Sequence, residues 1–414
     1  MHDFTYKNNQ LYCEHVRVSD IVSRVGTPAY IYSRKTFMDH IRKIQKAFRS
    51  LNPLICFSMK ANSNLAILRT MVREGAGLDI VSGGELYRAK RVQCPPGKIV
   101  FAGVGKTENE IRDALRYGIL FFNVESIPEL ELIQKIAGAM RRKARVSLRI
   151  NPDVDSRTHH YVTTGKKETK FGLDLRTAEE IFSHRDRYPA LEFCAIHVHI
   201  GSQIVIWDPF VQAFKKVLAF TEDLERMGGK IRFLNLGGGW GAVYHKEKPQ
   251  TADQLAKKIA PLFKGRRFEL VFEPGRFISA NGGILVTRTT YVKQTPVRNF
   301  AIVDAGMNDL IRPSLYDAYH EICPLVRKSG TSKRIYDVVG PICESGDFLA
   351  KGRTLQKIEA GDYLAVMSAG AYGFTMSSNY NSRPRSCEVL VDGRKFKVVR
   401  KRETYASLVA GEAF

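Results

Sequence analysis

The stretch Leu54-Ile55-Cys56-Phe57-Ser58-Met59-Lys60-Ala61-Asn62 is the starting point for the fold of this chain. It begins with a mostly apolar run after Pro53, and a run of this length predicts a buried strand. Lys60 ends the run, so we expect its ammonium group where a buried sheet opens to solvent. Loss of hydration lowers the pKa of a lysine, and a partly neutral lysine attacks aldehydes. The alternative is a strand-end lysine that only extends to water.

Further apolar runs follow this one and alternate with helical patterns. The expected strands are 54–59, 77–81, 98–101, 119–123, 145–150, 194–200, 232–236 and 268–273, and the clearest helices are 107–116, 126–139, 209–227 and 252–264. Thr107 with Glu110, and Ser126 with Glu129, are capping boxes that mark helix starts. Eight strands alternating with helices predict a (β/α)8 TIM-type barrel. An open doubly wound sheet usually has fewer strands and a GxGxxG start, which is absent here.

The chain changes character after residue 279. Short β-rich runs separated by Gly and Pro cover 284–287, 300–303, 336–339, 363–366 and 387–391. They predict an all-β domain, and the strand-like segment 9–33 is expected to join it. The predicted domains are therefore a barrel over 34–278 and a β-rich domain formed by 1–33 and 279–414.

Composition excludes several classes of protein. With 414 residues, 44% hydrophobic and 26% charged, the chain has ordinary globular composition. The 64 Lys and Arg against 42 Asp and Glu give a net charge of +22. These basic residues are dispersed and no nucleic-acid motif accompanies them, so we expect a solvated basic surface rather than a nucleic-acid partner. There is no signal or membrane pattern, and seven scattered cysteines favour a reducing cytoplasm.

Polar residues gather where the predicted barrel strands end, at the edge that carries active sites in such barrels. They are Lys60, Asp79, Asn123, Asn151, His199, Gly237 and Glu273. Gly238 and Gly239 follow strand seven, and Gly275 and Arg276 follow strand eight. Consecutive glycines let backbone N–H groups approach an anion closely, so we expect a phosphate site there, although a tight turn also explains a triple glycine.

His197 and His199 alternate at strand spacing and are expected on one side of the strand. Two such histidines are possible metal ligands, but no carboxylate or cysteine cluster lies near them in sequence, so we expect no metal. A neutral imidazole instead suits stacking on an aromatic cofactor ring. In the β-rich domain, Cys343 lies between Gly and Pro turns beside Glu344, which is less typical of a core thiol. Tyr372 lies in a Gly-Ala-Tyr-Gly loop suited to close on a phosphate or a ring.

Taken together, these residues resemble the alanine-racemase-like class of pyridoxal-phosphate enzymes and, more narrowly, the diaminopimelate decarboxylase family. The resemblance runs nearly end to end, from Gly26-Thr27-Pro28 to Arg402-Glu403-Thr404-Tyr405. Its specific motifs are Phe57-Ser58-Met59-Lys60-Ala61-Asn62, Asn151-Pro152-Asp153-Val154-Asp155, Lys170-Phe171-Gly172, His199-Ile200-Gly201-Ser202-Gln203, Gly237-Gly238-Gly239, Glu273-Pro274-Gly275-Arg276, Cys343-Glu344-Ser345 and Gly370-Ala371-Tyr372-Gly373.

The resemblance implies a role for each motif around pyridoxal 5'-phosphate. Lys60 carries the cofactor covalently, His199 stacks on its ring, and Glu273 pairs with the ring nitrogen. Residues placed around the cofactor and its phosphate are Asp79, Ser202, Gly238, Gly239, Gly275, Arg276 and Tyr372. Those placed on the substrate are Arg276, Arg312, Tyr316, Glu344 and Tyr372.

The resemblance also implies the reaction and the assembly. The substrate is meso-2,6-diaminopimelate, the products are L-lysine and CO2, and the enzyme is a homodimer with shared active sites. Cys343, from the partner chain, donates a proton, and Glu344 recognises the distal ammonium. A sibling decarboxylase for ornithine, arginine or carboxynorspermidine is the nearest alternative. A racemase, a further alternative, would require a catalytic tyrosine. A non-catalytic cofactor-binding protein is usually a barrel alone, whereas a β-rich domain follows the barrel here.

Overall fold

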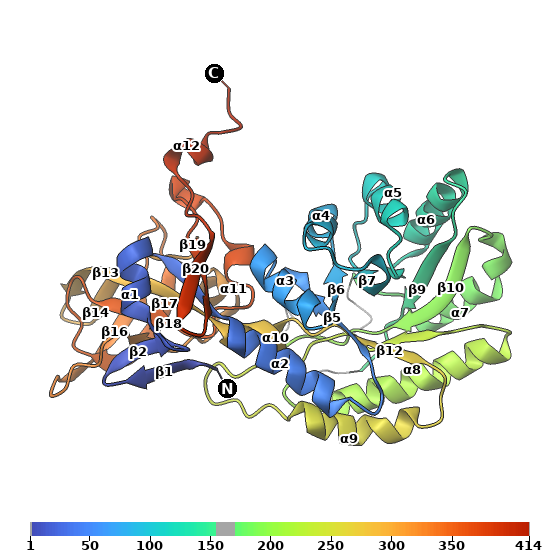
Figure 1. Ribbon diagram of the computed structural model, residues 1–414, viewed down its shortest axis with the longest axis horizontal. Helices are drawn as coiled ribbons and strands as arrows, with labels where there is room; N and C mark the ends of the chain where they lie inside the picture. Colours follow the sequence, from blue (N-terminus) through green and yellow to red (C-terminus); the bar gives the residue numbers. More distant parts are fainter. Residues whose placement is uncertain (1, 155–169, 414) are drawn as a thin grey trace. The chain divides into compact units, whose positions relative to one another are not determined.

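The computed structural model describes residues 2–154 and 170–413. The chain divides into two compact units (Figure 1). One comprises His40–Gly241 and Lys248–Phe277, and the other comprises Met1–Asp39, Ala242–Glu247 and Ile278–Phe414. Helices α2 (Arg34–Ala47) and α10 (Arg276–Ser279) each contain residues of both units. In the ranges that the structure describes, no helix is long and apolar enough to cross a membrane.

In the described part of the first unit, eight parallel strands close into a barrel. Their order around it is the order of the chain, with the last strand beside the first. Most of their residues are buried, as expected for parallel strands covered on both faces. The (β/α)8 barrel predicted from the sequence is confirmed, and every predicted strand overlaps an observed one. The strands are β5 (Leu54–Ser58), β6 (Gly77–Ile80), β7 (Ile99–Phe101), β8 (Phe121–Val124), β9 (Ala144–Arg149), β10 (Leu191–His197), β11 (Phe233–Asn235) and β12 (Glu269–Phe272).

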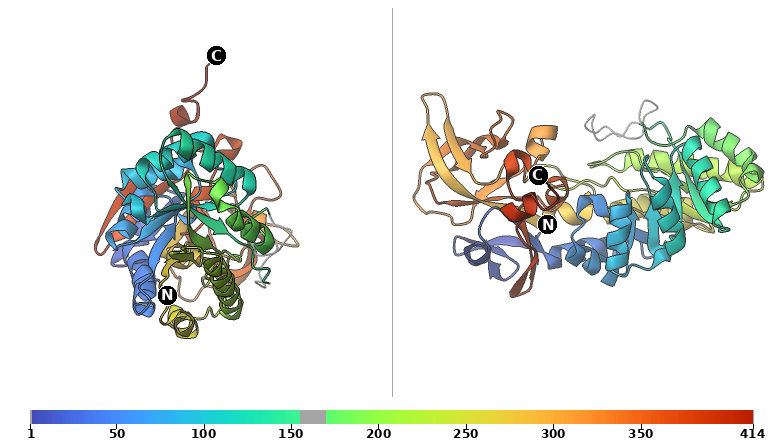
Figure 2. Two further views of the ribbon diagram at one scale, coloured as in Figure 1. Left: turned by 90° about the vertical axis from the view of Figure 1, so that its right-hand side faces the viewer. Right: turned by 90° about the horizontal axis from the view of Figure 1, so that it is seen from above.

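Helices surround the barrel strands (Figure 2, left). They are α3 (Leu65–Arg73), α4 (Gly83–Arg91), α5 (Glu108–Tyr117), α6 (Ile127–Ala139), α7 (Leu175–Ser183), α8 (Asp208–Arg226) and α9 (Ala252–Phe263). The predicted capping box of Thr107 and Glu110 begins α5. The second predicted capping box, Ser126 with Glu129, has only one of its two expected hydrogen bonds. Ser126 caps α6, but the Glu129 carboxylate accepts from the backbone N–H of Glu125 instead of Ser126, because it belongs to a buried ionic network.

The second unit is built on antiparallel and mixed β-sheet, which confirms the predicted β-rich class. The sheet path runs β17-β16-β14-β13-β4-β19-β20, with β18 paired to β13 and β15 paired to β18. The strands are β4 (Ala29–Ser33), β13 (Gly283–Gln294), β14 (Asn299–Val303), β15 (Ile322–Pro324), β16 (Lys333–Val339), β17 (Phe348–Gln356), β18 (Tyr363–Val366), β19 (Cys387–Asp392) and β20 (Lys395–Arg400). Two short helices, α11 (Arg312–Tyr316) and α12 (Tyr405–Leu408), belong to the same unit.

The N-terminal segment is part of this β unit. Strand β4 pairs with both β13 and β19, which places it inside the sheet. Strands β1 (Phe4–Lys7), β2 (Gln10–Cys13) and β3 (Val16–Arg17) form a small sheet of their own. The prediction of strand throughout 9–33 was partly wrong, because Val18–Val25 is helix α1. That helix buries Val18, Ile21 and Val22 on one face, the spacing of an amphipathic helix rather than a strand.

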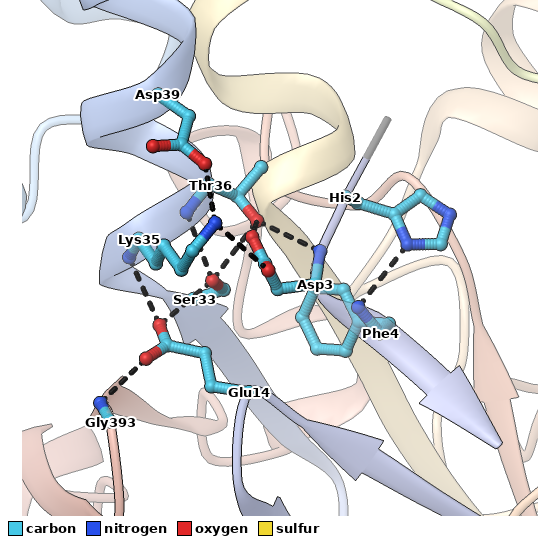
Figure 3. Close-up of polar contacts among 9 residues, drawn as sticks. All are labelled: His2, Asp3, Phe4, Glu14, Ser33, Lys35, Thr36, Asp39 and Gly393. Atoms are coloured by element: carbon cyan, nitrogen blue, oxygen red, sulfur yellow. Dashed lines mark hydrogen bonds and ion pairs between the residues drawn. The ribbon is translucent and has the colours of Figure 1, made fainter. Parts of the chain in front are cut away.

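Polar contacts join the N-terminal segment to distant parts of the unit (Figure 3). The Glu14 carboxylate accepts hydrogen bonds from Ser33 Oγ at 2.8 Å and from the backbone N–H of Gly393 at 2.6 Å. Asp3 accepts from Thr36 Oγ1 at 2.9 Å and forms an ion pair with Lys35. These contacts explain how an N-terminal strand stays within a sheet made mainly of C-terminal strands.

Candidate active site

Lys60 lies just beyond the carboxyl end of β5. Strand β5 ends at Ser58, and a single 3-10 turn, Met59–Ala61, carries Lys60. The residues before and after Lys60 are buried, whereas Lys60 itself is exposed. The short turn therefore presents one cation from an otherwise buried backbone at the edge of the barrel, as the sequence pattern predicted.

Asp79 is buried one strand away from Lys60. Its Oδ2 accepts a 2.6 Å hydrogen bond from Ser58 Oγ, and Oδ1 has no hydrogen-bond partner among the described residues. Burial raises the pKa of Asp79, the neighbouring Glu273 carboxylate raises it further, and the positive charge of Lys60 opposes both. Asp79 is therefore a buried carboxyl group that resists ionisation.

Glu273 follows β12 and has the opposite electrostatic behaviour. Its Oε1 accepts hydrogen bonds from Asn235 Nδ2 at 2.6 Å and Asn123 Nδ2 at 3.2 Å, and its Oε2 lies 3.2 Å from His197 Nε2. Burial alone would raise the pKa of Glu273, but the contacts with His197 and Asn235 outweigh burial and hold this pKa well below its usual range. Glu273 is thus an ionised carboxylate fixed by three side chains.

His199 lies two residues beyond the end of β10. The predicted strand continued to residue 200, but β10 ends at His197, so the alternation of a strand does not place His199. The backbone N–H of Gly238 donates to His199 Nδ1 at 3.2 Å. Burial, Lys60 and Arg149 lower the pKa of His199 well below the value of a free histidine. The ring is therefore neutral, with its proton on Nε2.

The glycines after β11 form a cradle that has no room for side chains. A Cβ on Gly238 would lie 2.0 Å from the backbone oxygen of Glu273, and one on Gly239 would lie 2.0 Å from that of Gly201. Gly237 and Gly239 also adopt positive φ angles of 64° and 94°. Only a residue without a Cβ therefore lets the turn after β11 pack this closely against neighbouring backbone.

Arg276 and Ser202 lie beside this cradle. Arg276 is buried, and its Nε and Nη2 atoms donate to Ser202 Oγ at 3.2 and 3.1 Å. Gly275 is packed tightly, since a Cβ there would lie 3.0 Å from those of Ala61 and Ser58. A guanidinium, a hydroxyl and the glycine turn therefore lie together at the ends of β11 and β12. This is the donor chemistry that a phosphate group requires.

The barrel residues fit pyridoxal phosphate. A site for this cofactor needs a lysine for the aldehyde, a carboxylate for the ring nitrogen and hydrogen-bond donors for the phosphate. Lys60, Glu273 and Arg276 are groups of these three kinds, and the neutral ring of His199 suits the face of a pyridine.

The remaining predicted residues belong to the β unit. Arg312 is the first residue of α11, and its side chain is buried. Its Nη1 lies 2.9 Å from His320 Nε2, and its guanidinium carbon lies 4.6 Å from the centre of the Tyr244 ring. Tyr316 ends the same helix and is half-buried. Arg312 is therefore a cation held in a fixed place by two rings.

Two loops of the β unit carry the other predicted residues. Cys343 and Glu344 are exposed, the backbone N–H of Cys343 donates to Asn381 Oδ1 at 2.9 Å, and the Glu344 carboxylate accepts from the Tyr380 hydroxyl. Tyr372 is half-buried and has a φ of +54°, which few non-glycine residues adopt. Asp155, the last residue of one quoted motif, lies outside the described residues.

Sequence reasoning missed several residues that hold the site in place. Asn235 and His197 bind Glu273, and Arg149 acts on His199. A polar residue inside a buried strand is a usable signal, because it must find a hydrogen-bond partner there. Asn235 in β11 and Arg149 at the end of β9 carry that signal. Their partners are contributed by other strands, and no sequence spacing reveals them.

Comparison with known proteins agrees with the fold. A model of the pyridoxal-binding domain of pyridoxal-dependent decarboxylases matches residues 34–280. The diaminopimelate decarboxylase of Pseudomonas aeruginosa is 49% identical, over 100% of this chain and 99% of the relative. The fold and the site thus define a pyridoxal-dependent decarboxylase.

Comparison with solved structures identifies the family within this class of decarboxylases. Diaminopimelate decarboxylase of Helicobacter pylori, complexed with L-lysine, has a TM-score of 0.91 and 40% identity, covering 95% of this chain and 98% of that one. The M. jannaschii enzyme with L-lysine has a TM-score of 0.94 and 36% identity, covering 100% and 99%. The chain belongs to the diaminopimelate decarboxylase family.

Proposed function

We propose that this protein decarboxylates meso-2,6-diaminopimelate to L-lysine and CO2 with bound pyridoxal 5'-phosphate. The observation that carries the proposal is the constellation at the carboxyl ends of the barrel strands: an exposed lysine, an ionised buried carboxylate and a neutral histidine around a glycine cradle. Full-length similarity to diaminopimelate decarboxylases, some solved with L-lysine, supports the choice of substrate.

Lys60 would hold the cofactor through its aldehyde, and Arg276, Ser202, Gly238 and Gly239 would hold its phosphate. When bound, the cofactor supplies an electron sink for the pair of electrons that departing CO2 leaves behind. The Arg276–Ser202 hydrogen bonds and the tightly packed glycine turn beside them support these assignments.

Glu273 would keep the ring nitrogen protonated. Its own pKa is held low, so it remains a carboxylate opposite a cation. Asp79, whose pKa is raised, would remain largely neutral beside it, so the two acids avoid placing two negative charges in one buried site. His199 would cover one face of the ring without adding charge.

Substrate recognition and protonation are assigned to the β unit. Arg312, Tyr316 and Tyr372 would bind the substrate together with Arg276 of the barrel unit, which also serves the phosphate. Arg276 and Arg312 would bind carboxylates, and Glu344 would bind the distal ammonium. The thiol of Cys343 would donate the proton that Cα needs after CO2 leaves. We infer that the loop with Cys343 and Glu344 serves the partner subunit of a cytoplasmic homodimer, and its exposure suits that role.

Sibling decarboxylases remain the competing class, because they share the same cofactor chemistry. Two cations for carboxylates, Arg276 and Arg312, together with one anion, Glu344, suit a substrate with two carboxylates and two amines. Ornithine has only one carboxylate and would form one fewer charge-assisted contact with this pair of cations. Loss of such a contact costs binding energy, so the residue set favours diaminopimelate.

The test uses purified protein incubated with pyridoxal phosphate and carboxyl-labelled meso-diaminopimelate. Wild-type protein should release labelled CO2 and form L-lysine in equal amounts. Borohydride reduction followed by peptide mapping should place the cofactor on Lys60, and Lys60→Ala should form no lysine. An adduct on another lysine, or unchanged substrate with cofactor bound, would contradict the proposal.

A further inference from the structure

A buried ammonium group lies beside the site without being part of it. The side chain of Lys106 is 0% exposed, although lysine is among the residues least often buried. Its Nζ donates to the backbone oxygens of Gly103 at 2.7 Å and Asn123 at 2.8 Å, and to Glu129 Oε1 at 2.7 Å. All three N–H donors of the ammonium group are therefore used.

A second buried ion pair continues from the first. Glu129 Oε2 accepts from the backbone N–H of Glu125 at 2.9 Å. Glu125 Oε1 accepts from the backbone N–H of Gly103 at 2.9 Å, and its Oε2 accepts from Arg149 Nη1 at 2.8 Å. The side chains of Glu125 and Arg149 are 1% and 7% exposed. Two cations and two carboxylates thus form a neutral buried network at the carboxyl ends of β7, β8 and β9.

Both ends of this network reach residues of the candidate active site. The backbone oxygen of Asn123 accepts a hydrogen bond from Lys106 Nζ, and Nδ2 of the same asparagine donates to Glu273 Oε1 at 3.2 Å. At the other end, Arg149 is one of the charges that keep His199 neutral. The network therefore contacts the supports of both groups that would touch the cofactor ring.

We propose that Lys106 is a positioning residue of the active site. It fixes the carboxyl end of β8, which carries Asn123 and Glu125. Asn123 then holds the carboxylate of Glu273 in place, and Glu125 holds the guanidinium of Arg149. Lys106 touches neither substrate nor cofactor in this arrangement.

Stability alone is a poor reason for such a network. Taking two ion pairs out of water is costly, and replacing a buried pair by neutral groups of similar volume is often neutral or stabilising. Removing one partner alone is different, because the other charge is left buried without compensation. A test must therefore remove Lys106 and Glu129 together.

The test compares the double variant Lys106→Met/Glu129→Gln with a matched exposed pair, Lys90→Met/Asp113→Asn, on α4 and α5. Lys90 Nζ lies 2.6 Å from Asp113 Oδ1, but the two side chains are 30% and 46% exposed. The glutamine at 129 keeps an oxygen for the backbone N–H of Glu125. For each protein one measures the melting temperature without cofactor, the dissociation constant for pyridoxal phosphate, kcat, and the pH midpoint of the bound cofactor's absorption.

The inference rests on the proposed function. Wild-type protein in the same assay separates failure of the inference from failure of the function. If wild-type protein forms no lysine, that result counts against the proposed function alone. If Lys106 positions the site, the double variant keeps its melting temperature, loses on the order of 10- to 100-fold in kcat, and shifts the pH midpoint. The exposed pair should match wild type in every measurement.

Wild-type kcat and an unshifted midpoint in the double variant would overturn the inference and leave the network a structural one. If the double variant does not fold, Lys106→Arg decides. Its planar guanidinium keeps the charge but cannot direct three donors to the same three oxygens. It should then fold, bind cofactor more weakly and show the same shift in midpoint, whereas wild-type values in Lys106→Arg would also overturn the inference.

Discussion

Asn235 and Glu273 are joined by a 2.6 Å hydrogen bond between neighbouring barrel strands, and both side chains are buried. Asn235 is the last residue of β11, and its side chain uses Nδ2 for this carboxylate and Oδ1 for the backbone N–H of Gly237 at 3.1 Å. Together with His197 and Asn123, it keeps Glu273 ionised in a place where burial would otherwise favour the neutral acid. Protonation of the ring nitrogen of bound pyridoxal phosphate would depend on this arrangement.

Glu273→Gln tests that arrangement. The amide keeps the shape of the side chain but loses the charge that would hold the ring nitrogen protonated. We expect the cofactor to remain bound while kcat falls by about two orders of magnitude or more, the scale seen when one preorganised electrostatic group is removed. Steady-state kinetics and the absorption spectrum give both quantities. Turnover near the wild-type rate would mean that another group serves the ring nitrogen.

Gly238→Ala tests the glycine cradle. The added methyl group would lie 2.0 Å from a backbone oxygen, so the backbone must move. We expect a destabilisation of roughly 1–3 kcal/mol, as for other overpacked sites, and weaker binding of pyridoxal phosphate. Gly97→Ala is the control, because a Cβ at Gly97 meets nothing within 4 Å. Equal cofactor affinity in the two variants would show that the cradle does not bind the phosphate.

His199 gives a prediction for pH. Its pKa is lower in the folded protein than in the unfolded chain, so the folded state binds fewer protons there. Stability contributed by the neutral ring is present above about pH 6.5 and is lost as the pH falls toward the folded pKa. Urea unfolding of cofactor-free protein between pH 5 and 7.5 should therefore give a shallower slope in His199→Gln than in wild type. Parallel slopes would contradict the assignment of a neutral ring.

Subunit mixing tests whether sites are shared between chains. Lys60→Ala and Cys343→Ala should each be inactive. After random exchange of subunits, a heterodimer has one site with both residues intact, so the mixture should recover about a quarter of wild-type activity under two-fold symmetry. Exchange is verified separately with a mass-tagged chain. Exchange without recovery would mean that each site is built from a single chain.

The sequence predicted the parts of this protein that local patterns encode. Buried parallel strands are continuous apolar runs, so the run ending at Lys60 and the seven others were visible, as was the capping box at Thr107. The strand-end rule of barrels then brought Lys60, Asp79 and Glu273 to one edge. These inferences succeeded because period, length and turn residues all lie within a few positions of each other.

The errors and omissions have a common physical origin. Helix α1 was missed because it has only eight residues, four of which are β-branched. The Glu129 carboxylate does not complete the capping box because it pairs with the buried Lys106. The network around Lys106 could not be predicted, because its members lie on different strands and helices and meet only in the folded barrel. Tertiary partners, unlike caps and periods, leave no fixed spacing.

Direct competition between substrates tests the central claim most directly. Purified protein with saturating pyridoxal phosphate is given equal concentrations of meso-diaminopimelate and L-ornithine, and the products are separated and quantified. We predict L-lysine as the main product with at least a tenfold preference in kcat/KM, the factor that corresponds to about 1.4 kcal/mol of discrimination. Putrescine as the main product would contradict the assignment to diaminopimelate and favour a sibling decarboxylase on the same fold.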